Sequence, residues 1–379
     1  MTNPTLNAPT GFFRTPKEVY SYNKINIGSK TGETLMATCP TYGDVVIKRP
    51  GLTNPDMLIM SNADLVREKR ALTTDGIRDH RCVCRLLDDG EAVDRGLKYI
   101  YLVIERAKGT NLETLISQYQ MQGKGLPEGV LVRVVAEFLD LLKVAHRHNV
   151  IYNDVKIEHL FVSFSHGASG DLALKVIDWG NAAFVGDGSQ KELSDDVFQC
   201  GELIYKLYTG ESFKQSQSES NWLQSGKTVW EIDFPRVVPV KIQKILEKAL
   251  HPLKASRYAD AGKLLEAFKI YLSEFEINNQ EERARILQVV AVPSLQAFEE
   301  ATLRLARLLE HDPADFDTIK LSDDIKQRKE LFTSRQLLDE ILSYISVDEW
   351  QKAQQLLGGL KDEPTRRILE ASITTALDF

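Results

Sequence analysis

The stretch from residue 151 to 161 holds a carboxylate and an amine at a spacing suited to phosphate chemistry. Asp154 and Lys156 lie two residues apart there, and a later apolar run ends at Asp178. A carboxylate can accept a proton from an attacking hydroxyl, and a lysine can neutralise charge on a moving phosphoryl group. An aspartate at a strand end can hold the magnesium ion that bridges nucleotide phosphates. These residues predict an ATP-dependent transferase that uses ATP and Mg²⁺.

The order of these residues resembles that of the protein kinase-like superfamily, in particular the bacterial eukaryotic-type Ser/Thr kinase-like proteins. The family's catalytic loop has the form H-R-D-x-K-x-x-N and its metal motif is D-F-G. Here the first is Tyr-Asn-Asp-Val-Lys-Ile-Glu-His over residues 152–159, and the second is Asp-Trp-Gly over residues 178–180. The resemblance implies catalytic roles for Asp154 and Lys156, and metal binding by Asp178 and His159.

His159 departs from the family pattern, which has Asn at this position as a ligand for a second magnesium ion. Imidazole is a poor partner for a hard cation that prefers oxygen. Two interpretations stay open for this residue: an auxiliary ligand, or a histidine packed in the core beside Leu160 and Phe161.

Nucleotide binding is also implied by the resemblance. Lys48 ends a Val-Val-Ile-Lys run, as in the family's V-A-I-K strand, and Glu68 follows as its expected ion-pair partner. Gly28 and Gly32 supply only two glycines for a phosphate loop, and a simple hairpin turn explains them equally well. The full set of predicted nucleotide-binding residues is Gly28, Gly32, Val46, Lys48, Glu68, Ile104, Glu105, Ala107 and Phe161.

Composition limits the class of protein. The 379 residues are 43% hydrophobic and 27% charged, which is typical of a globular chain long enough for two or three domains. A net charge of -7 argues against nucleic acid as a partner. We found neither a leader pattern nor eighteen uninterrupted apolar residues, so no membrane association is expected. The four cysteines form no metal-ligand set and favour free buried thiols, and we expect a cytoplasmic protein.

Hydrophobic periodicity predicts the fold class α+β. Strands over residues 25–47, 83–87 and 99–105 with one helix over residues 62–74 predict a small, mostly antiparallel lobe. Longer helices follow, among them an amphipathic one over residues 127–148. Its seven apolar positions at helical spacing are Leu131, Val134, Val135, Phe138, Leu141, Leu142 and Ala145. Two further helices are expected over residues 259–272 and 280–291. The prediction is a bilobal protein kinase-like fold followed by an all-α C-terminal appendage. Its parts are a loosely packed lead-in (1–24), an N-lobe (25–105), a C-lobe (106–274) and a helical C-terminal domain (275–379).

The chain also lacks features on which protein kinases depend. Asn153 replaces the arginine that contacts a phosphorylated activation loop, and only residues 181–195 separate Gly180 from Asp196. No A-P-E triplet occurs, so Arg257 is either free or paired with Glu192.

Two hypotheses follow from this mixture of kept and lost features. The first is an active phosphotransferase, acting on a protein Ser/Thr or on a small molecule. The second is a pseudokinase, a nucleotide-sensing or scaffolding module. In that case the C-terminal helices would be presented to a protein partner.

Overall fold

The computed structural model describes residues 11–26, 32–51, 55–94, 96–164, 172–215, 218–220 and 230–377. The chain divides into two compact units. The first comprises residues 1–167 and 171–273, and the second comprises residues 168–170 and 274–379. The division near residue 273 lies within one residue of the expected start of the C-terminal domain.

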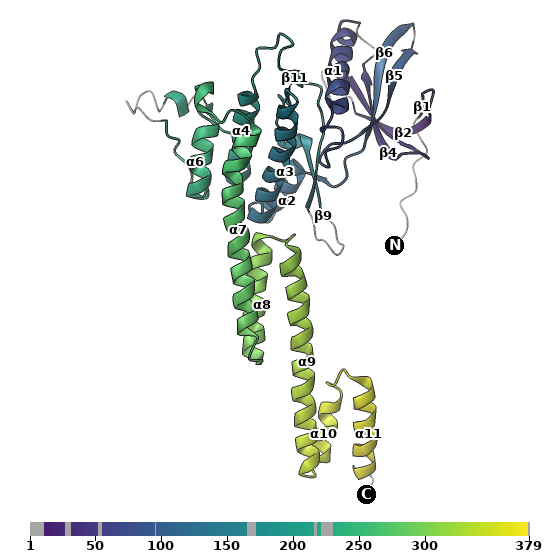
Figure 1. The fold of residues 1–379 in the computed structure, drawn as a ribbon. Helices are drawn as coiled ribbons and strands as arrows, with labels where there is room; N and C mark the ends of the chain where they lie inside the picture. The colour runs from purple at the N-terminus through teal and green to yellow at the C-terminus, as the bar shows by residue number, and fades with distance from the viewer. Residues whose placement is uncertain are drawn as a thin grey trace. The chain divides into compact units, whose positions relative to one another are not determined.

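The first unit begins with an antiparallel sheet that one helix covers (Figure 1). The strand order is β1-β2-β3-β4-β6-β5. Helix α1 (Pro55–Thr73) contacts the strands β3 to β6. The strands are β1 (Gly11–Arg14), β2 (Val19–Asn26), β3 (Gly32–Cys39), β4 (Gly43–Pro50), β5 (Leu86–Asp94) and β6 (Leu97–Glu105).

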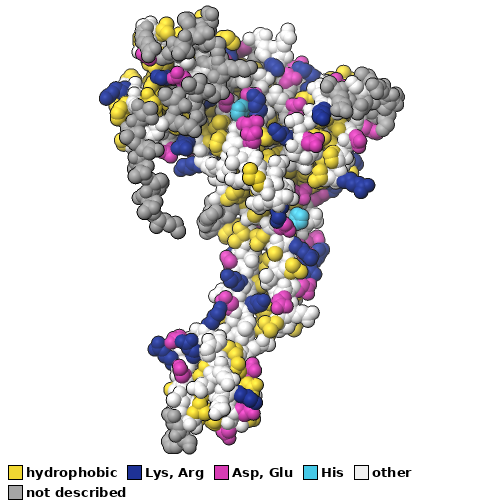
Figure 2. All heavy atoms as spheres, turned by 180° about the vertical axis from the view of Figure 1, so that it is seen from behind, with side chains coloured by type: hydrophobic (Ala, Val, Ile, Leu, Met, Phe, Trp, Pro, Cys, Tyr) yellow, Lys and Arg dark blue, Asp and Glu magenta, His cyan; other side chains and the backbone are white. Residues whose placement is uncertain are grey.

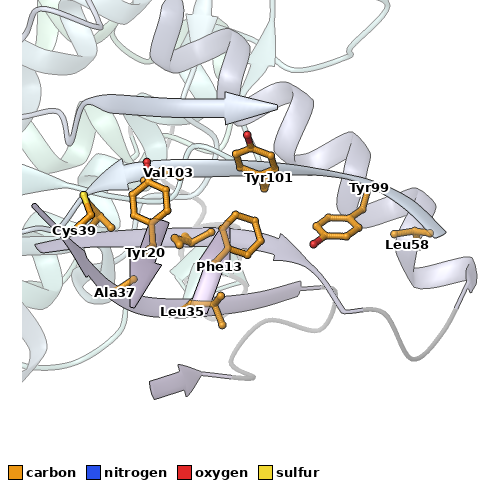
Figure 3. Close-up of a cluster of buried hydrophobic side chains, with 11 residues drawn as sticks. Phe13, Tyr20, Leu35, Ala37, Cys39, Leu58, Tyr99, Tyr101 and Val103 are labelled. Carbon is orange, nitrogen blue, oxygen red and sulfur yellow. The ribbon is translucent and has the colours of Figure 1, made fainter. Parts of the chain in front are cut away.

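Alternation along these strands separates a packed face from a face that remains open to a ligand. In β4, Val45 and Ile47 are fully buried in the N-lobe core, whereas Val46 and Lys48 point to the other face. Successive side chains of a strand point to opposite faces, so this division follows directly from the sequence. Figure 3 shows the core cluster on the packed face, with side chains from β1, β2, β3 and β6 and Leu58 of α1.

The expectation of a loosely packed lead-in over residues 1–24 is wrong for residues 11–24. These residues form β1 and most of β2, and Gly11 to Arg14 pair with Val19 to Tyr22. Phe13 and Tyr20 are buried, and the ring of Phe13 meets the edge of Tyr101 at 5.2 Å between centroids. The prediction gave too much weight to the polar residues of this segment and too little to Phe13 and Tyr20, which pack it against the sheet.

The helical lobe surrounds one deeply buried helix. Helix α3 (Glu128–Arg147) carries its seven predicted apolar positions inside the core, as expected. The other helices are α2 (Leu112–Met121), α4 (Leu193–Thr209), α6 (Val240–Ala249) and the first part of α7 (Ala261–Val289). The described part of this lobe also contains the short elements β7 (Thr110–Asn111), β8 (Val150–Ile151), η1 (Ile157–His159), β9 (Leu160–Phe164), β10 (Leu172–Val176), β11 (Ala183–Phe184) and η2 (Lys254–Ser256).

Several element boundaries differ from the prediction. Helix α1 begins at Pro55, seven residues before the expected start at residue 62. The strand expected over residues 83–87 begins only at Leu86, and Val83 forms an isolated bridge with Val176. The helices expected over residues 259–272 and 280–291 are one continuous helix, α7. No proline or glycine lies between Lys263 and Val289 to interrupt it, so residues 273–279 continue the helix.

The second unit is helical, as predicted. It contains the later part of α7 with α8 (Leu295–His311), α9 (Phe316–Ser346), α10 (Trp350–Leu357) and α11 (Glu363–Leu377). Two small apolar clusters hold it, one around Phe298 and Leu305 and the other around Ile341 and Ile373. Basic and acidic side chains are interspersed over the face that Figure 2 displays. A partner for this unit stays a prediction.

Among the described residues, no helix has both the length and the apolarity needed to cross a bilayer. The described fold is the predicted one: a sheet lobe and a helical lobe, with an all-α appendage.

Adjacent phenylalanines test the role of β1. Phe13 is 5% exposed and Phe12 is 62% exposed. Replacing Phe13 by Ala should lower the free energy of unfolding by about 3–5 kcal/mol, because a buried ring is lost and a cavity remains. Phe12→Ala is the matched control and should change it by less than about 0.5 kcal/mol. Urea denaturation measures both, and equal effects would show that β1 does not contribute to the core.

Candidate functional site

A cavity of about 360 Å³ lies between the sheet lobe and the helical lobe. The open faces of β3, β4 and β6 form one side, and β9 and the segment after β10 form the other. Its lining contains all of the predicted nucleotide-binding residues except the two glycines. It consists of Thr34, Met36, Val46, Lys48, Glu68, Leu72, Cys84, Ile104, Glu105, Arg106, Ala107, Gly109, Phe161, Val176, Ile177, Asp178 and Trp179.

The predicted phosphate loop is described only at its end. Gly28 lies outside the described residues. Gly32 begins β3, pairs with Pro50 of β4 and is not among the residues that line the cavity. The hairpin interpretation of this segment therefore fits the described part.

One ammonium group joins three parts of the cleft. Nζ of Lys48 lies 2.7 Å and 2.9 Å from the two carboxylate oxygens of Glu68, and 2.9 Å from Oδ1 of Asp178. Burial alone would lower the pKa of Lys48, but the two carboxylates outweigh it and raise that pKa above its ordinary value. The lysine is thus a fixed positive charge between α1 and the segment after β10.

Glu68 lies deeper than its partners and is 2% exposed. Its burial raises its pKa, against the attraction of Lys48. The backbone N–H of Trp179 donates to Glu68 Oε1 at 3.4 Å, while the Trp179 ring is buried against Tyr152 at 4.8 Å between centroids. A buried carboxylate is costly unless such donors surround it. Glu68 therefore links α1 to the backbone beside Asp178.

Asp178 adopts a left-handed backbone conformation, with φ 65°. Aspartate is among the few residue types that tolerate it. Burial would raise the pKa of Asp178, but the charge and hydrogen bond of Lys48 lower it overall, so the carboxylate is held ionised. While Oδ1 contacts Lys48, Oδ2 lies 3.6 Å from Nε2 of His159.

The carboxylate of Asp154 is positioned by two neighbours. Lys156 Nζ lies 2.5 Å from Oδ1, and the side-chain amide of Asn181 donates to Oδ2 at 3.1 Å. His159 Nδ1 lies 3.8 Å from the same Oδ2. Lys156 and Asp154 therefore lie together, as the resemblance implied. Asn181 was not predicted, although it stands immediately after the Asp-Trp-Gly triplet.

A buried aspartate holds the backbone of the catalytic loop. Asp196 accepts from the backbone N–H groups of Tyr152 and Asn153, each at 2.7 Å. Its Oδ2 also lies 2.9 Å from His146 Nε2. The N–H of Ala261 donates to His146 Nδ1 at 3.0 Å, so Nε2 of this ring carries the hydrogen that reaches Asp196. The loop that presents Asp154 is thus fixed from α3 and α4.

Helix α1 is also fastened to the segment after Gly180. Nε of Arg67 donates to the carbonyl oxygen of Gly180 at 3.1 Å. Arg70 pairs with Asp187, and its guanidinium lies 3.7 Å above the ring centre of Phe184. The helix that carries Glu68 is therefore held by the carboxylate of Asp187 and the carbonyl oxygen of Gly180. Neither contact requires a phosphorylated residue.

The prediction that Arg257 is free or paired with Glu192 is wrong. Its Nη1 lies 3.7 Å from Oδ1 of Asp195 and donates to the carbonyl oxygen of Ser194 at 3.3 Å. Nε donates to the carbonyl oxygen of His251 at 2.7 Å. Glu192 instead caps α4, where it forms a reciprocal pair of hydrogen bonds with Asp195.

Several lining residues were missed, although the sequence held a signal for two of them. A short turn joins β3 to β4, so Cys39 pairs with Gly43, and the register then sets Met36 opposite Val46 and Thr34 opposite Lys48. Residues paired in this way lie on the same face of a sheet. Cys84 and Leu72 carry no comparable local signal, because their place in the cavity depends on packing between distant segments.

The donor set fits a divalent cation. Asp154, His159 and Asp178 each offer one ligand atom, and these atoms lie within 4.8 Å of one another. Two carboxylates with one imidazole form a mixed oxygen and nitrogen set, which first-row divalent ions accept. His159 therefore lies with the predicted metal ligand Asp178 and is not confined to the apolar core.

Comparison with known proteins agrees with this geometry. A model of the protein kinase domain matches residues 60–268, more than half of the chain. The serine/threonine-protein kinase PknL of Mycobacterium tuberculosis is 27% identical over 208 residues, which cover 48% of this chain and 50% of that protein. PknB of Mycolicibacterium smegmatis is 23% identical over 180 residues, covering 39% of this chain and 27% of that protein. The kinase pkn3 of Myxococcus xanthus is 25% identical over 242 residues, covering 57% and 43%.

The matches thus span a quarter to a half of the length of these relatives. The family match begins within α1, after Lys48, so it does not cover that lysine, whose position in the cleft comes from the structure. Catalytic loop, metal motif and buried Asp196 lie inside the matched region in the family order. The chain belongs to the protein kinase domain family.

Proposed function

We propose that this chain is an ATP-dependent phosphotransferase that moves the γ-phosphoryl group of ATP to an alcohol hydroxyl. The observation that carries the proposal is the convergence on one cavity edge of Lys48, Asp178 and Asp154. Lys48 lies 2.9 Å from Asp178, and Asp178 and Asp154 are within 4.8 Å of each other by their ligand atoms. An ion pair with only a structural role would not require the open cavity that continues from Lys48 and Asp178 to Val46 and Phe161.

The nucleotide would occupy the cavity with its base between Val46 and Phe161, beside the main chain from Ile104 to Ala107. Val46 takes the place of the family's smaller alanine and narrows this slot. Lys48 would donate to the phosphates, because Glu68 holds its side chain along the cleft. A divalent cation held by Asp178 and His159 would supply positive charge to the phosphate oxygens.

In the transfer step, the acceptor oxygen bonds to the γ-phosphorus while the bond from that phosphorus to the β,γ-bridging oxygen breaks. Asp154 would take the hydroxyl proton, with its carboxylate aimed by Asn181 and Lys156. Lys156 is more than half exposed and would place its charge near the transferred group. The products are a phosphate ester and ADP.

The acceptor would be a protein Ser/Thr or a small molecule. Between Gly180 and α4 the described chain forms β11 and turns, with residues 185–192 exposed. This short segment offers a peptide little extended surface, which favours an acceptor that needs no long groove.

The pseudokinase alternative is favoured by the same short segment and by imidazole in place of the family's amide at residue 159. Under this alternative the chain binds ATP but moves no phosphate. Incubation with γ-labelled ATP distinguishes the two: label on protein, sugar or water supports the transferase. Bound but unconsumed ATP supports the sensor.

Asp178→Asn tests nucleotide binding. At an ATP concentration about 100 times its Kd, the intact site should gain about 2.7 kcal/mol of stability. The variant should lose the part that depends on divalent cation, because a neutral amide replaces the carboxylate that faces His159. Differential scanning fluorimetry with and without ATP and cation measures the shift. Asp75→Asn, at a residue 79% exposed by its side chain, is the control. Full metal-dependent stabilisation of the variant would contradict the role of Asp178.

Asp154→Asn separates binding from transfer. The variant should still bind ATP, since Asp154 is not among the lining residues and the cation would keep Asp178 and His159. Its transfer rate should fall by about 10²-fold or more, because the proton acceptor is lost. The matched control is Glu158→Gln, an exposed residue of the same loop. Transfer of labelled phosphate measures the rate, and an unchanged rate for Asp154→Asn would remove Asp154 from the mechanism.

A further inference from the structure

The orientation of His159 fixes which ring nitrogen is available to a ligand. Nδ1 lies 3.0 Å from the carbonyl oxygen of Asp154. A carbonyl oxygen only accepts, so Nδ1 must carry the hydrogen. The Tyr152 hydroxyl is a second acceptor at 3.1 Å, because its own hydrogen is donated to the carbonyl oxygen of Ile177 at 2.6 Å. In the neutral ring, Nε2 therefore carries no hydrogen and has a free lone pair that can bind a cation.

That electron pair lies beside a carboxylate oxygen. Nε2 is 3.6 Å from Oδ2 of Asp178, while Oδ1 of Asp178 is held by Lys48. Two adjacent ligands with bonds of about 2.1 Å to one octahedral ion are about 3.0 Å apart. The pair would therefore need to close by about half an ångström. The ring is 12% exposed and hydrogen-bonded on its other nitrogen, so it is already oriented.

We propose that this site binds Mn²⁺ in preference to Mg²⁺, with Nε2 of His159 as a ligand. Mg²⁺ demands oxygen donors and gives up water reluctantly, whereas a first-row cation accepts imidazole. The other donors at the site, the carboxylates of Asp178 and Asp154 and the nucleotide phosphates, are oxygen atoms and suit Mn²⁺. The inference rests on the proposed function, because the phosphates complete the coordination.

Pulsed EPR of Mn²⁺ on the full chain tests the ligand without measuring turnover. The chain is saturated with a methylene-bridged ATP analogue, which has no nitrogen in its phosphate bridge. The expected spectrum contains a coupling to ¹⁴N that changes when the protein is labelled with ¹⁵N-histidine. A bound Mn²⁺ with no histidine coupling overturns the inference and leaves the proposed function standing. Failure of the analogue to bind with either cation overturns both.

Metal selectivity gives a second readout. Kd values for Mn²⁺ and Mg²⁺ are measured by calorimetry in the presence of the analogue, for the native chain and for His159→Asn. The asparagine supplies an amide oxygen in place of the ring nitrogen. The preference for Mn²⁺ should fall by about tenfold or more. An unchanged ratio of the two Kd values, in a folded variant that still binds the analogue, overturns the inference. If the variant does not fold, the EPR spectrum of the native chain decides.

Discussion

The sharing of the Lys48 ammonium between Glu68 and Asp178 determines how the cleft is assembled. Lys48 comes from the sheet, Glu68 from α1, and Asp178 from the segment after β10. One cation and two anions leave a negative excess in a partly buried place, and for that reason the deeper carboxylate needs the Trp179 N–H as well. Removing these three charged groups from water costs free energy that can exceed their mutual attraction, so the arrangement is weak evidence that the fold is stabilised. Its value is positional, because three segments distant in sequence are brought to one edge of the cavity.

Keeping this arrangement requires α1 to stay against the helical lobe. In the protein kinases that the catalytic loop resembles, an arginine before the aspartate contacts a phosphorylated loop, and here Asn153 occupies that position. The chain instead presents Asp187 to Arg70 and the Gly180 carbonyl to Arg67. A surface ion pair adds little energy alone. Combined with the contact of Arg70 on Phe184, it gives α1 a fixed partner that exists as soon as the chain folds.

The sequence predicted those parts of the site whose identity is local and missed those that depend on distant packing. The order of Lys48, Glu68, Asp154 and Asp178 was enough to place three charged side chains in the cavity lining with Asp154 beside them. The hairpin register could have added Thr34 and Met36. Asn181 was missed because an asparagine after a glycine is typical of any turn. Strand β1 and most of β2 were missed because their sequence is largely polar, whereas the burial of Phe13 and Tyr20 is enough to hold them in the sheet. Helix α7 was divided in two, although residues 273–279 contain no proline or glycine that would end a helix.

His159 places an imidazole where the family pattern has an amide, and its two ring nitrogens face different groups. Its Nδ1–H bonds the Asp154 carbonyl, so the ring braces the catalytic loop. A planar ring that is fixed at one nitrogen must direct the other along the opposite side, which here is towards Asp178. Loss of the family's amide is therefore no sign by itself of a lost function. It exchanges an amide for an imidazole whose Nε2 lies 3.6 Å from Oδ2 of Asp178.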